Sequence, residues 1–235
     1  MNKIIEQVRT ELIENADEKT RVSGLRFFKE EVKIYGLKSA HVSTIAKQNF
    51  QKIKNLSKQE IFELCEELWQ SGYMEESFIA CNWSYAMQKQ FQESDFEIFE
   101  NWVGNYIANW ASCDTFCNHT VGEFIEKFPA FIERLKKWTR SENRWMRRAS
   151  AVSLIIPARK GKFLNDIFEI AGILLPDKED MVQKGYGWML KEASKPYQKE
   201  VFEFVVKNKA VMPRTALRYA IEKMPEELRK KAMEK

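Results

Sequence analysis

Apolar residues recur at helical spacing along almost the whole chain, and this periodicity constrains the fold more than any other feature. In the segment IFELCEELW, apolar side chains between Ile61 and Trp69 fall three and four residues apart, and FEIFENWVGNYIANW repeats the pattern. No segment alternates apolar and polar residues for long enough to indicate a strand. Only 9 Gly and 6 Pro interrupt 235 residues, which favours long helices over tight turns. The sequence therefore predicts an all-α protein.

A longer register of large and small residues accompanies this periodicity. Each of five large residues near the end of a predicted helix is followed, eleven positions later, by a small residue. Successive large residues are 34, 37, 32 and 36 positions apart, which is typical of HEAT-like repeats that each contain a helix, a turn and a second helix. We expect each small residue to let the second helix approach its neighbour closely. The pairs are Tyr35 and Ala46, Trp69 and Ala80, Tyr106 and Cys117, Trp138 and Ala149, and Leu174 and Gly185.

This register predicts an α-solenoid of about six HEAT-like helical repeats, whose second helices line a concave basic face. We expect one domain over residues 1–235, with N-terminal repeats at about 1–72 and the repeats that carry the site at about 95–225. Two serines have a glutamate three residues later, which is the spacing of a capping box. We therefore expect helices to begin after Ser57, which precedes Glu60, and after Ser94, which precedes Glu97.

Composition excludes several classes of protein. Apolar residues make up 44% of the chain and charged residues 31%, which suffices for a core and argues against disorder. The chain has no apolar run of about 18 residues, so we expect no membrane span. The charged N-terminal segment lacks the apolar centre of a signal peptide, so we expect a cytoplasmic protein. Its cysteines are then expected to be reduced packing residues: Cys65, Cys81, Cys113 and Cys117.

Positive charge is concentrated in one part of the chain. Between Lys127 and Lys162 there are eleven basic residues, and only Glu133 and Glu142 oppose them. This stretch therefore carries 11 − 2 = +9, and the rest of the chain sums to −5 within the total of +4. Such a concentration suits a polyanion, because neutralised phosphates release condensed counterions. Nucleic-acid binding and a merely solvated helical face both remain open at this point.

Three segments carry the candidate site residues. Asn109-Trp110-Ala111-Ser112-Cys113-Asp114 places an aspartate near a helix start, where Asp also serves as a favoured N-cap, so a catalytic and a capping role are both open. SENRWMRRAS (141–150) and QKGYGWMLKEASK (183–195) add tryptophans and cations. In the repeat register, the principal residues lie within four positions of a small residue on a second helix. We therefore expect these side chains to converge on the basic concavity: Asp114, Trp145, Arg148 and Trp188.

The runs NW-ASCD, SENRW-RRA and QK-GW-LKEASK resemble the corresponding motifs of the AlkD-type alkylpurine DNA glycosylases, which are HEAT-like-repeat proteins of DNA alkylation repair. The resemblance covers most of the chain in helix count and spacing, and is most specific from Trp102 to Met224. It implies that Asp114 is the catalytic aspartate and that Trp110 and Trp188 hold the lesion nucleotide. It also implies that Arg148 contacts DNA.

The resemblance implies a hydrolase that cleaves the N-glycosidic bond of cationic N3- or N7-alkylpurines in double-stranded DNA. We expect Asp114 to stabilise the oxocarbenium ion between the two indoles of Trp110 and Trp188. We expect a monomer with no metal and no organic cofactor. The residues expected to bind DNA are Arg148, Arg147, Trp145, Arg144, Lys184, Lys38 and Lys47.

The chain departs from the family pattern in its N-terminal part. Phe27 stands where the family usually has an aromatic hydroxyl, and Ala40 and Ser43 stand where it usually has a proline and a DNA-contacting arginine. Lys38, Lys47 and His41 could partly replace the missing contacts. The superfamily also contains members without glycosylase activity, although the presence of Asp114 argues against that outcome here.

Two other interpretations follow from the sequence. The alternative function is a non-catalytic HEAT-like-repeat protein that binds branched or damaged DNA, or a protein partner, in which Asp114 is only a helix cap. The spacing of Cys113, Cys117 and His119 invites a zinc site, but the segment has no fourth ligand, so packing roles are favoured for these residues.

Overall fold

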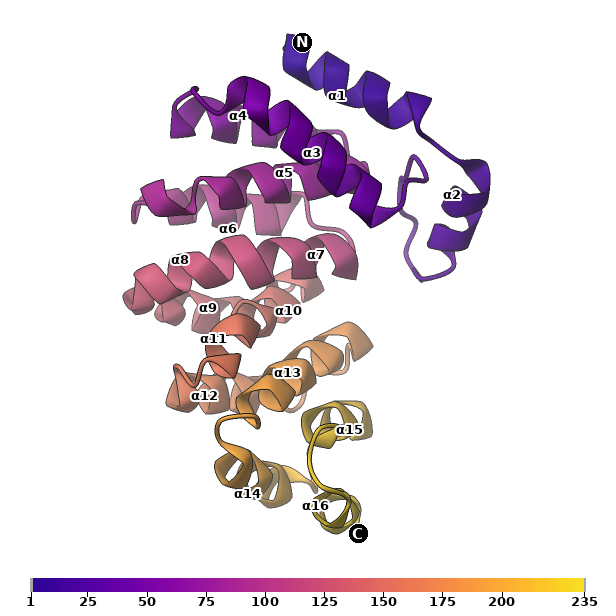
Figure 1. The fold of residues 1–235 in the computed structure, drawn as a ribbon. Helices are drawn as coiled ribbons and strands as arrows, with labels where there is room; N and C mark the ends of the chain where they lie inside the picture. Colours follow the sequence, from indigo (N-terminus) through magenta and orange to yellow (C-terminus); the bar gives the residue numbers. More distant parts are fainter. Residues whose placement is uncertain (1, 235) are drawn as a thin grey trace. The chain divides into compact units, whose positions relative to one another are not determined.

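A computed structural model describes residues 2–234 of the chain, and over these residues the regular structure is helical (Figure 1). The only strand-like feature among them is an isolated parallel bridge between Lys33 and Tyr73. The prediction of an all-α protein is therefore confirmed. Within the same described residues, every helix is too short or too polar to cross a membrane.

The chain forms two compact units, Met1–Phe116 and Cys117–Lys235. The sequence predicts one domain and no boundary at this point. A single HEAT-like array over residues 1–235, with about six repeats and a concave basic face, stays a prediction.

In the first unit, the helices pack in two layers (Figure 1). Helices α3, α5 and α7 pack consecutively in one layer, and α4 packs against α5 from the other. The rings of Phe62 on α4 and Trp102 on α6 meet edge to face at 5.6 Å, so α4 and α6 share an aromatic core. The bounds are α1 (Lys3–Glu14), α2 (Glu18–Leu25), α3 (Ser39–Ile53), α4 (Lys58–Gln70), α5 (Met74–Ala86), the short 3-10 helix η1 (Gln88–Gln90), α6 (Asp95–Asn105) and α7 (Trp110–Phe116).

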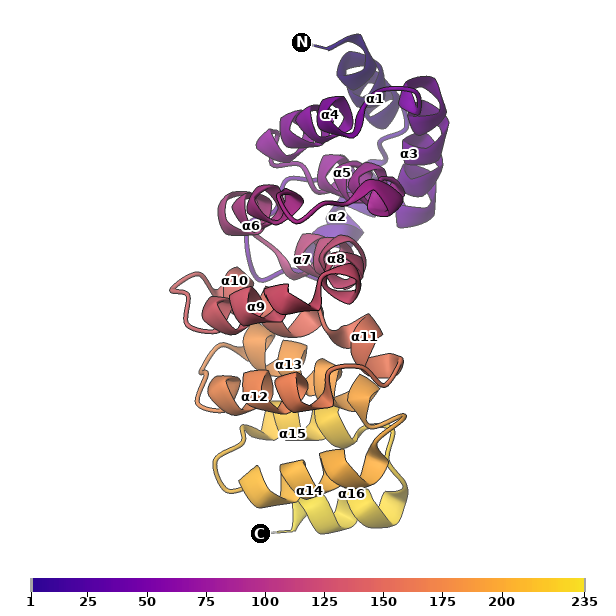
Figure 2. The ribbon, with the colours of Figure 1, turned by 90° about the vertical axis from the view of Figure 1, so that its left-hand side faces the viewer.

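In the second unit, α10, α13 and α15 pack consecutively, and α9 packs against both α10 and α12 (Figure 2). Helix α14 packs against α13, α15 and α16. The bounds are the π-helical turn η2 (Cys117–Val121), α8 (Gly122–Lys127), η3 (Pro129–Phe131), α9 (Ile132–Trp138), α10 (Arg144–Val152), α11 (Ile155–Arg159), α12 (Leu164–Leu174), α13 (Asp180–Ala193), α14 (Gln198–Asn208), α15 (Arg214–Ile221) and α16 (Glu226–Met233).

Two glycines of α13 allow its close packing on both neighbours. A Cβ atom on Gly187 would lie 2.7 Å from the Tyr219 Cβ and 2.8 Å from the Ala216 carbonyl oxygen, both on α15. A Cβ atom on Gly185 would lie 3.2 Å from the Arg148 Cγ on α10. The contact with α15 therefore requires glycine, and Gly185 lets α13 approach α10 as the register predicted.

The small residues of the register are all buried in helical turns: Ala46, Ala80, Cys117, Ala149 and Gly185. Their large partners lie near helix ends, as expected: Trp69 is the second-last residue of α4, Trp138 and Leu174 end α9 and α12, and Tyr106 follows α6 directly. Tyr35 is the exception, because it lies in the loop before α3. Its hydroxyl donates a hydrogen bond to Glu76 (2.8 Å), a contact forty-one residues away that no local pattern reveals.

One of the two predicted capping boxes is confirmed. Ser57 accepts a hydrogen bond from the Glu60 backbone N–H, and the Glu60 carboxylate accepts one from the Ser57 N–H at 2.8 Å. A helix does begin after Ser94, since α6 starts at Asp95, but the predicted capping box is wrong there, because Ser94 has helical backbone angles and makes no capping hydrogen bond with its side chain. Asp95 stabilises this helix start instead, since its carboxylate accepts from the Gln92 N–H (2.8 Å) and from Lys58 (2.7 Å).

Candidate functional site

Helix α7 carries the candidate carboxylate, and its N-terminus is capped by Asn109. The Asn109 Oδ1 accepts a hydrogen bond from the Ser112 backbone N–H at 2.9 Å, which is the usual N-cap contact to the third helical residue. The Ser112 hydroxyl in turn lies 2.7 Å from that of Ser77 on α5. Asp114 is the fifth residue of α7 and is half-buried. The interpretation of Asp114 as an N-cap is therefore wrong, because Asn109 fills that position.

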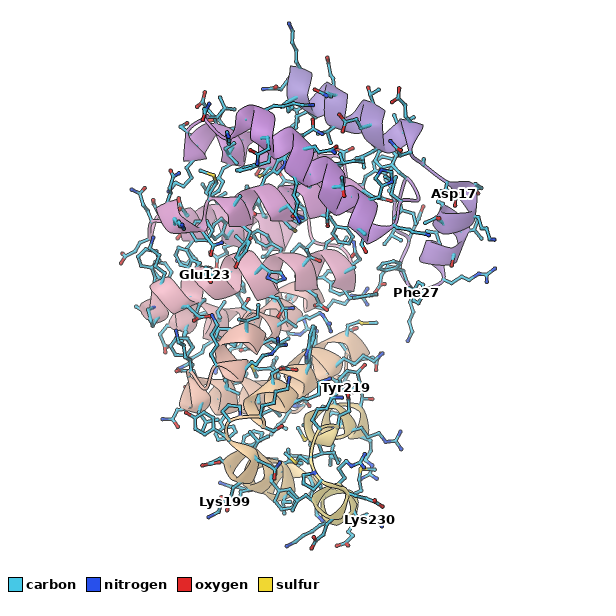
Figure 3. All side chains as sticks on the ribbon, in the orientation of Figure 1. Asp17, Phe27, Glu123, Lys199, Tyr219 and Lys230 are labelled. Atoms are coloured by element: carbon cyan, nitrogen blue, oxygen red, sulfur yellow. The ribbon has the colours of Figure 1, made fainter. Side chains whose placement is uncertain are left out.

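Trp110, the first residue of α7, is fixed by the loop that follows α2. Its indole N–H donates to the Phe27 carbonyl oxygen at 3.3 Å, and its ring stacks on Phe28 with centroids 5.4 Å apart and planes 21° apart. The Phe27 side chain itself is 72% exposed (Figure 3). Sequence reasoning singled out Phe27 and missed Phe28, although an adjacent pair of aromatic residues is the signal that could have drawn attention to it.

The loop before α3 brings Lys38 beside a cavity of about 710 Å³ that lies between α2 and the start of α3. Phe27, Lys38 and His41 all line this cavity, and Lys38 is the exposed N-cap residue of α3. Lys47 is also exposed and lies further along the same helix. The two lysines predicted to bind DNA in this part of the chain are therefore open to solvent.

Glu75, at the start of α5, holds this loop in place. Its buried carboxylate accepts hydrogen bonds from the backbone N–H groups of Tyr35 (3.1 Å), Gly36 (2.8 Å) and Leu37 (3.2 Å). Gly36 has a φ of 103°, and a Cβ atom there would lie 2.5 Å from the Asp17 carbonyl oxygen, so the turn requires glycine. The sequence does not single out Glu75, because a glutamate in the first turn of a helix is common and has no distinguishing pattern.

The neighbouring carboxylate of Glu76 is also buried and binds two elements. It accepts from the Arg9 guanidinium of α1 at 3.0 Å and from the Tyr35 hydroxyl at 2.8 Å. Burial and then the hydrogen bond to Glu76 raise the pKa of Tyr35 well above its usual range, so this hydroxyl remains a donor. Glu75 and Glu76 thus join α1, α5 and the loop before α3.

In the second unit, two of the predicted DNA-binding residues lie in the interior. Trp145 is 6% exposed and Arg148 is 5% exposed, both on α10. The Arg148 guanidinium donates to the Met181 carbonyl oxygen at the start of α13, and its aliphatic stem packs against Gly185. The guanidinium of Arg144 covers the Trp145 ring, 4.8 Å from its centroid. The sequence could not reveal this burial, because it depends on the glycine contact between α10 and α13.

Arg147 is bound at three points. It donates to the Asp177 carboxylate at 2.6 Å and to the carbonyl oxygens of Ser141 (2.8 Å) and Glu142 (3.0 Å). Its guanidinium therefore ties the segment before α10 to the segment before α13.

Arg144 and Lys184 are the more accessible of the predicted DNA-binding cations in this unit. Their side chains are 36% and 31% exposed and pair with Glu179 at 3.4 Å and with Asp180 at 2.7 Å, respectively. Trp188 is half-buried and lies four residues after Lys184 on α13, so the two side chains share one face of the helix.

Much of the positive charge between Lys127 and Lys162 is paired with carboxylates from outside that stretch. Lys136 contacts Asp166 (2.9 Å) and Glu169 (2.6 Å) as well as the local Glu133 (2.8 Å). Arg159 pairs with Glu192, and both Lys160 and Lys162 pair with Glu126. The count of +9 therefore overstates the charge available to a ligand, because neighbouring helices supply the opposing charges.

The predicted packing roles of the cysteines agree with the structure, in which all four are buried and free of disulfides. Within residues 2–234, no three His, Cys, Asp or Glu side chains gather in a way that could hold a metal ion.

Comparison with known proteins identifies the class and then the family of this all-helical protein. Its structure is similar to that of a predicted DNA alkylation repair enzyme from Enterococcus faecalis, with a TM-score of 0.80 and 17% sequence identity over 90% of this chain and 98% of the other. At this identity, the likeness shows a shared fold. A search of curated proteins finds no match. The model of a family described as "DNA alkylation repair enzyme" matches residues 8–224, so the chain belongs to that family, as its motifs predicted.

Proposed function

We propose that this protein is a DNA glycosylase that excises cationic N3- and N7-alkylpurines from double-stranded DNA. Family membership supports a substrate of alkylated DNA. The observation that carries the catalytic assignment is the position of Asp114, which lies inside α7 while Asn109 performs the capping. Asp114 also lies four residues after Trp110, so the carboxylate and the indole share a helix face.

These residue types suit the chemistry of the reaction. An alkylated purine already carries positive charge, so it can leave without protonation by a general acid. Positive charge then develops on the sugar, where the fixed carboxylate of Asp114 stabilises the oxocarbenium ion and orients the attacking water. The face of a tryptophan attracts the cationic base and sugar through its quadrupole, with a contribution of about 0.5–2 kcal/mol per contact. The reaction as proposed uses no metal and no organic cofactor.

Trp110 is suited to this role because its ring is held in one orientation. The stacked ring of Phe28 and the hydrogen bond to the Phe27 carbonyl oxygen restrict its rotation. A ring that is fixed before the substrate binds loses little entropy on binding. We propose that Trp188 supplies the second indole to the lesion nucleotide.

The predicted DNA-binding residues divide into two groups by exposure. We propose that phosphates are held by the accessible cations Arg144 and Lys184 in one unit and by Lys38 and Lys47 in the other. Arg147, Arg148 and Trp145 instead support the structure around Arg144 in the second unit, because their polar groups are engaged or buried. Substitution of the second group should then reduce the stability of the protein as well as its affinity for DNA.

The test is release of 7-methylguanine and 3-methyladenine from alkylated duplex DNA under single-turnover conditions. Asp114→Asn should lower the excision rate by at least about 100-fold while the affinity for the duplex stays within about twofold. Asp166→Asn is the matched control, since it removes one carboxylate from a partly exposed ion pair on α12 and should excise at the wild-type rate.

The alternative, a non-catalytic protein that binds branched or damaged DNA or a protein partner, makes the opposite prediction. It requires that the wild type and both variants bind DNA equally and release no base. Equal and substantial release by Asp114→Asn and the wild type would contradict the role assigned to Asp114.

A further inference from the structure

The segment 177–180, which leads into α13, is acidic, and each of its carboxylates pairs with a cation of the predicted DNA-binding set. Asp177 pairs with Arg147 at 2.6 Å and Glu179 with Arg144 at 3.4 Å. Asp180, the first residue of α13, pairs with Lys184 at 2.7 Å. Lys178 is the single basic residue among these four positions and is exposed. Three cations of the predicted DNA-binding set, two on α10 and one on α13, therefore contact carboxylates of one short segment.

The three pairs differ in their access to solvent. In the pair of Arg147 and Asp177 the side chains are 17% and 8% exposed, and both residues make further hydrogen bonds to the chain. The side chains of Glu179 and Asp180 are 43% and 41% exposed, and their cationic partners are about as accessible. The inner pair therefore supports the fold, whereas the outer pairs can open without disturbing the core.

We propose that Glu179 and Asp180 act as internal competitors of DNA phosphates and so set the strength of DNA binding. Each carboxylate occupies a position beside a guanidinium or ammonium group that a phosphate oxygen would otherwise take. A phosphate must displace a carboxylate to bind Arg144 or Lys184, so in the wild type these two contacts form in only part of the bound population. This inference rests on the proposed function for its ligand, which is the phosphate backbone of duplex DNA.

The competition acts on binding to any sequence. Phosphate contacts carry no sequence information, so weakening them lowers the affinity for undamaged DNA as well as for the lesion. A repair protein gains from this, because it must leave the excess of undamaged sites. Interactions of the catalytic carboxylate and the indoles with a cationic lesion do not depend on Arg144 or Lys184, so the ratio of the two affinities is kept while the protein leaves undamaged sites more readily.

The experiment measures the affinity of full-length protein for an undamaged duplex as a function of salt concentration. Breaking one exposed ion pair lowers an equilibrium constant by about 1.5- to 5-fold. The double variant Glu179→Gln, Asp180→Asn removes two such pairs, so it should bind DNA about 2- to 25-fold more tightly than the wild type. The slope of log K against log salt should also steepen by up to about 2, since each added phosphate contact contributes about 0.9.

Two control proteins separate this effect from net charge. Glu203→Gln with Glu226→Gln makes the same change of charge in the exposed pairs with Lys199 on α14 and Lys230 on α16, both labelled in Figure 3. This control should bind with nearly wild-type affinity and slope. In the second control, Arg144→Gln and Lys184→Gln are added to the Glu179→Gln, Asp180→Asn variant, and this should abolish the gain in DNA affinity. Thermal denaturation confirms that each variant is folded.

The outcomes distinguish this inference from the proposed function. If the wild type excises alkylpurines but the Glu179→Gln, Asp180→Asn variant binds undamaged DNA no more tightly than the Glu203→Gln, Glu226→Gln control, the competition is refuted and the glycosylase stands. If the variant gains affinity and slope while no protein releases a base, the competition stands and the catalytic assignment fails.

Discussion

In the unit that spans residues 1–116, Glu75 and Asn109 are buried and bonded to the backbone, whereas in the unit that spans residues 117–235 the more accessible cations Arg144 and Lys184 form ion pairs with access to water. Glu75 accepts three backbone N–H groups and Asn109 caps α7. Arg144 and Lys184 instead contact exposed carboxylates. Buried hydrogen bonds fix a geometry, and exposed ion pairs exchange partners. The first arrangement suits the placement of a catalytic group, and the second suits reversible binding of a polyanion.

The largest expected effect comes from Glu75, whose buried carboxylate holds the loop before α3 in the first unit. Glu75→Gln leaves at least one of three buried N–H groups facing a donor, and should lower the free energy of unfolding by about 2–3 kcal/mol. Urea denaturation measures this change. Glu63→Gln, on the exposed face of α4, is the control and should change stability by less than about 0.5 kcal/mol. If both variants lost a similarly small free energy of unfolding, the buried hydrogen bonds of the first unit would be no stronger than the exposed ion pairs of the second.

The second unit has its own rigid element, which is the glycine contact between α13 and α15. Gly187→Ala places a methyl group 2.7 Å from the Tyr219 Cβ and should destabilise the protein by about 1–3 kcal/mol. Gly172→Ala is a matched control within α12, because nothing lies within 4 Å of its added Cβ. That substitution should stabilise by up to about 1 kcal/mol through helix propensity. A neutral Gly187→Ala in denaturant titration would show that α13 and α15 can separate freely.

The support of Trp110 by Phe28 should be visible in the reaction rate. Phe28→Ala removes the stacked ring and should slow excision by about 2- to 10-fold, because an aromatic pair of this kind contributes about 0.5–1.5 kcal/mol. Phe28→Tyr keeps the ring and should restore the rate. The measurement is the single-turnover excision rate, together with the affinity for the duplex. A lower affinity with an unchanged excision rate would assign Phe28 to DNA binding instead.

The smallest effect concerns the pH dependence of an ion pair in the second unit. Burial raises the pKa of the Glu192 carboxyl, but hydrogen bonds from Lys195 and Arg159 outweigh burial and hold the pKa below its usual 4.5. The ionised Glu192 carboxylate and its two cationic partners therefore stabilise the fold above pH 4.5. This contribution is lost as the pH falls through the folded-state pKa of Glu192. Between pH 6 and pH 3.5, the wild type should lose up to about 1 kcal/mol more than Glu192→Gln. Parallel pH profiles would contradict the contribution of this pair.

Sequence reasoning succeeded where local patterns determine structure. The periodicity around Ile61 predicted α4, the Ser57 and Glu60 spacing predicted its capping box, and the small residues of the register are buried as expected. Each of these depends on contacts within a helix or between adjacent helices.

It failed where distant residues decide the outcome. Tyr35 lies in a loop because Glu75 and Glu76, about forty residues later, bind it. Arg148 is buried because Gly185 lets α13 approach α10. Carboxylates outside residues 127–162 pair with much of the positive charge of that stretch, and only the fold reveals these ion pairs.

The proposed reaction depends most on stabilisation of positive charge on the sugar by the Asp114 carboxylate. A direct measurement compares two duplexes, one with a cationic pyrrolidine in place of the lesion sugar and one with the uncharged tetrahydrofuran analogue. The wild type should bind the cationic duplex at least about 100-fold more tightly, because an enzyme is complementary to its transition state, and Asp114→Asn should lose most of this preference. Equal preference for the cationic duplex in the wild type and in Asp114→Asn would contradict this role of Asp114.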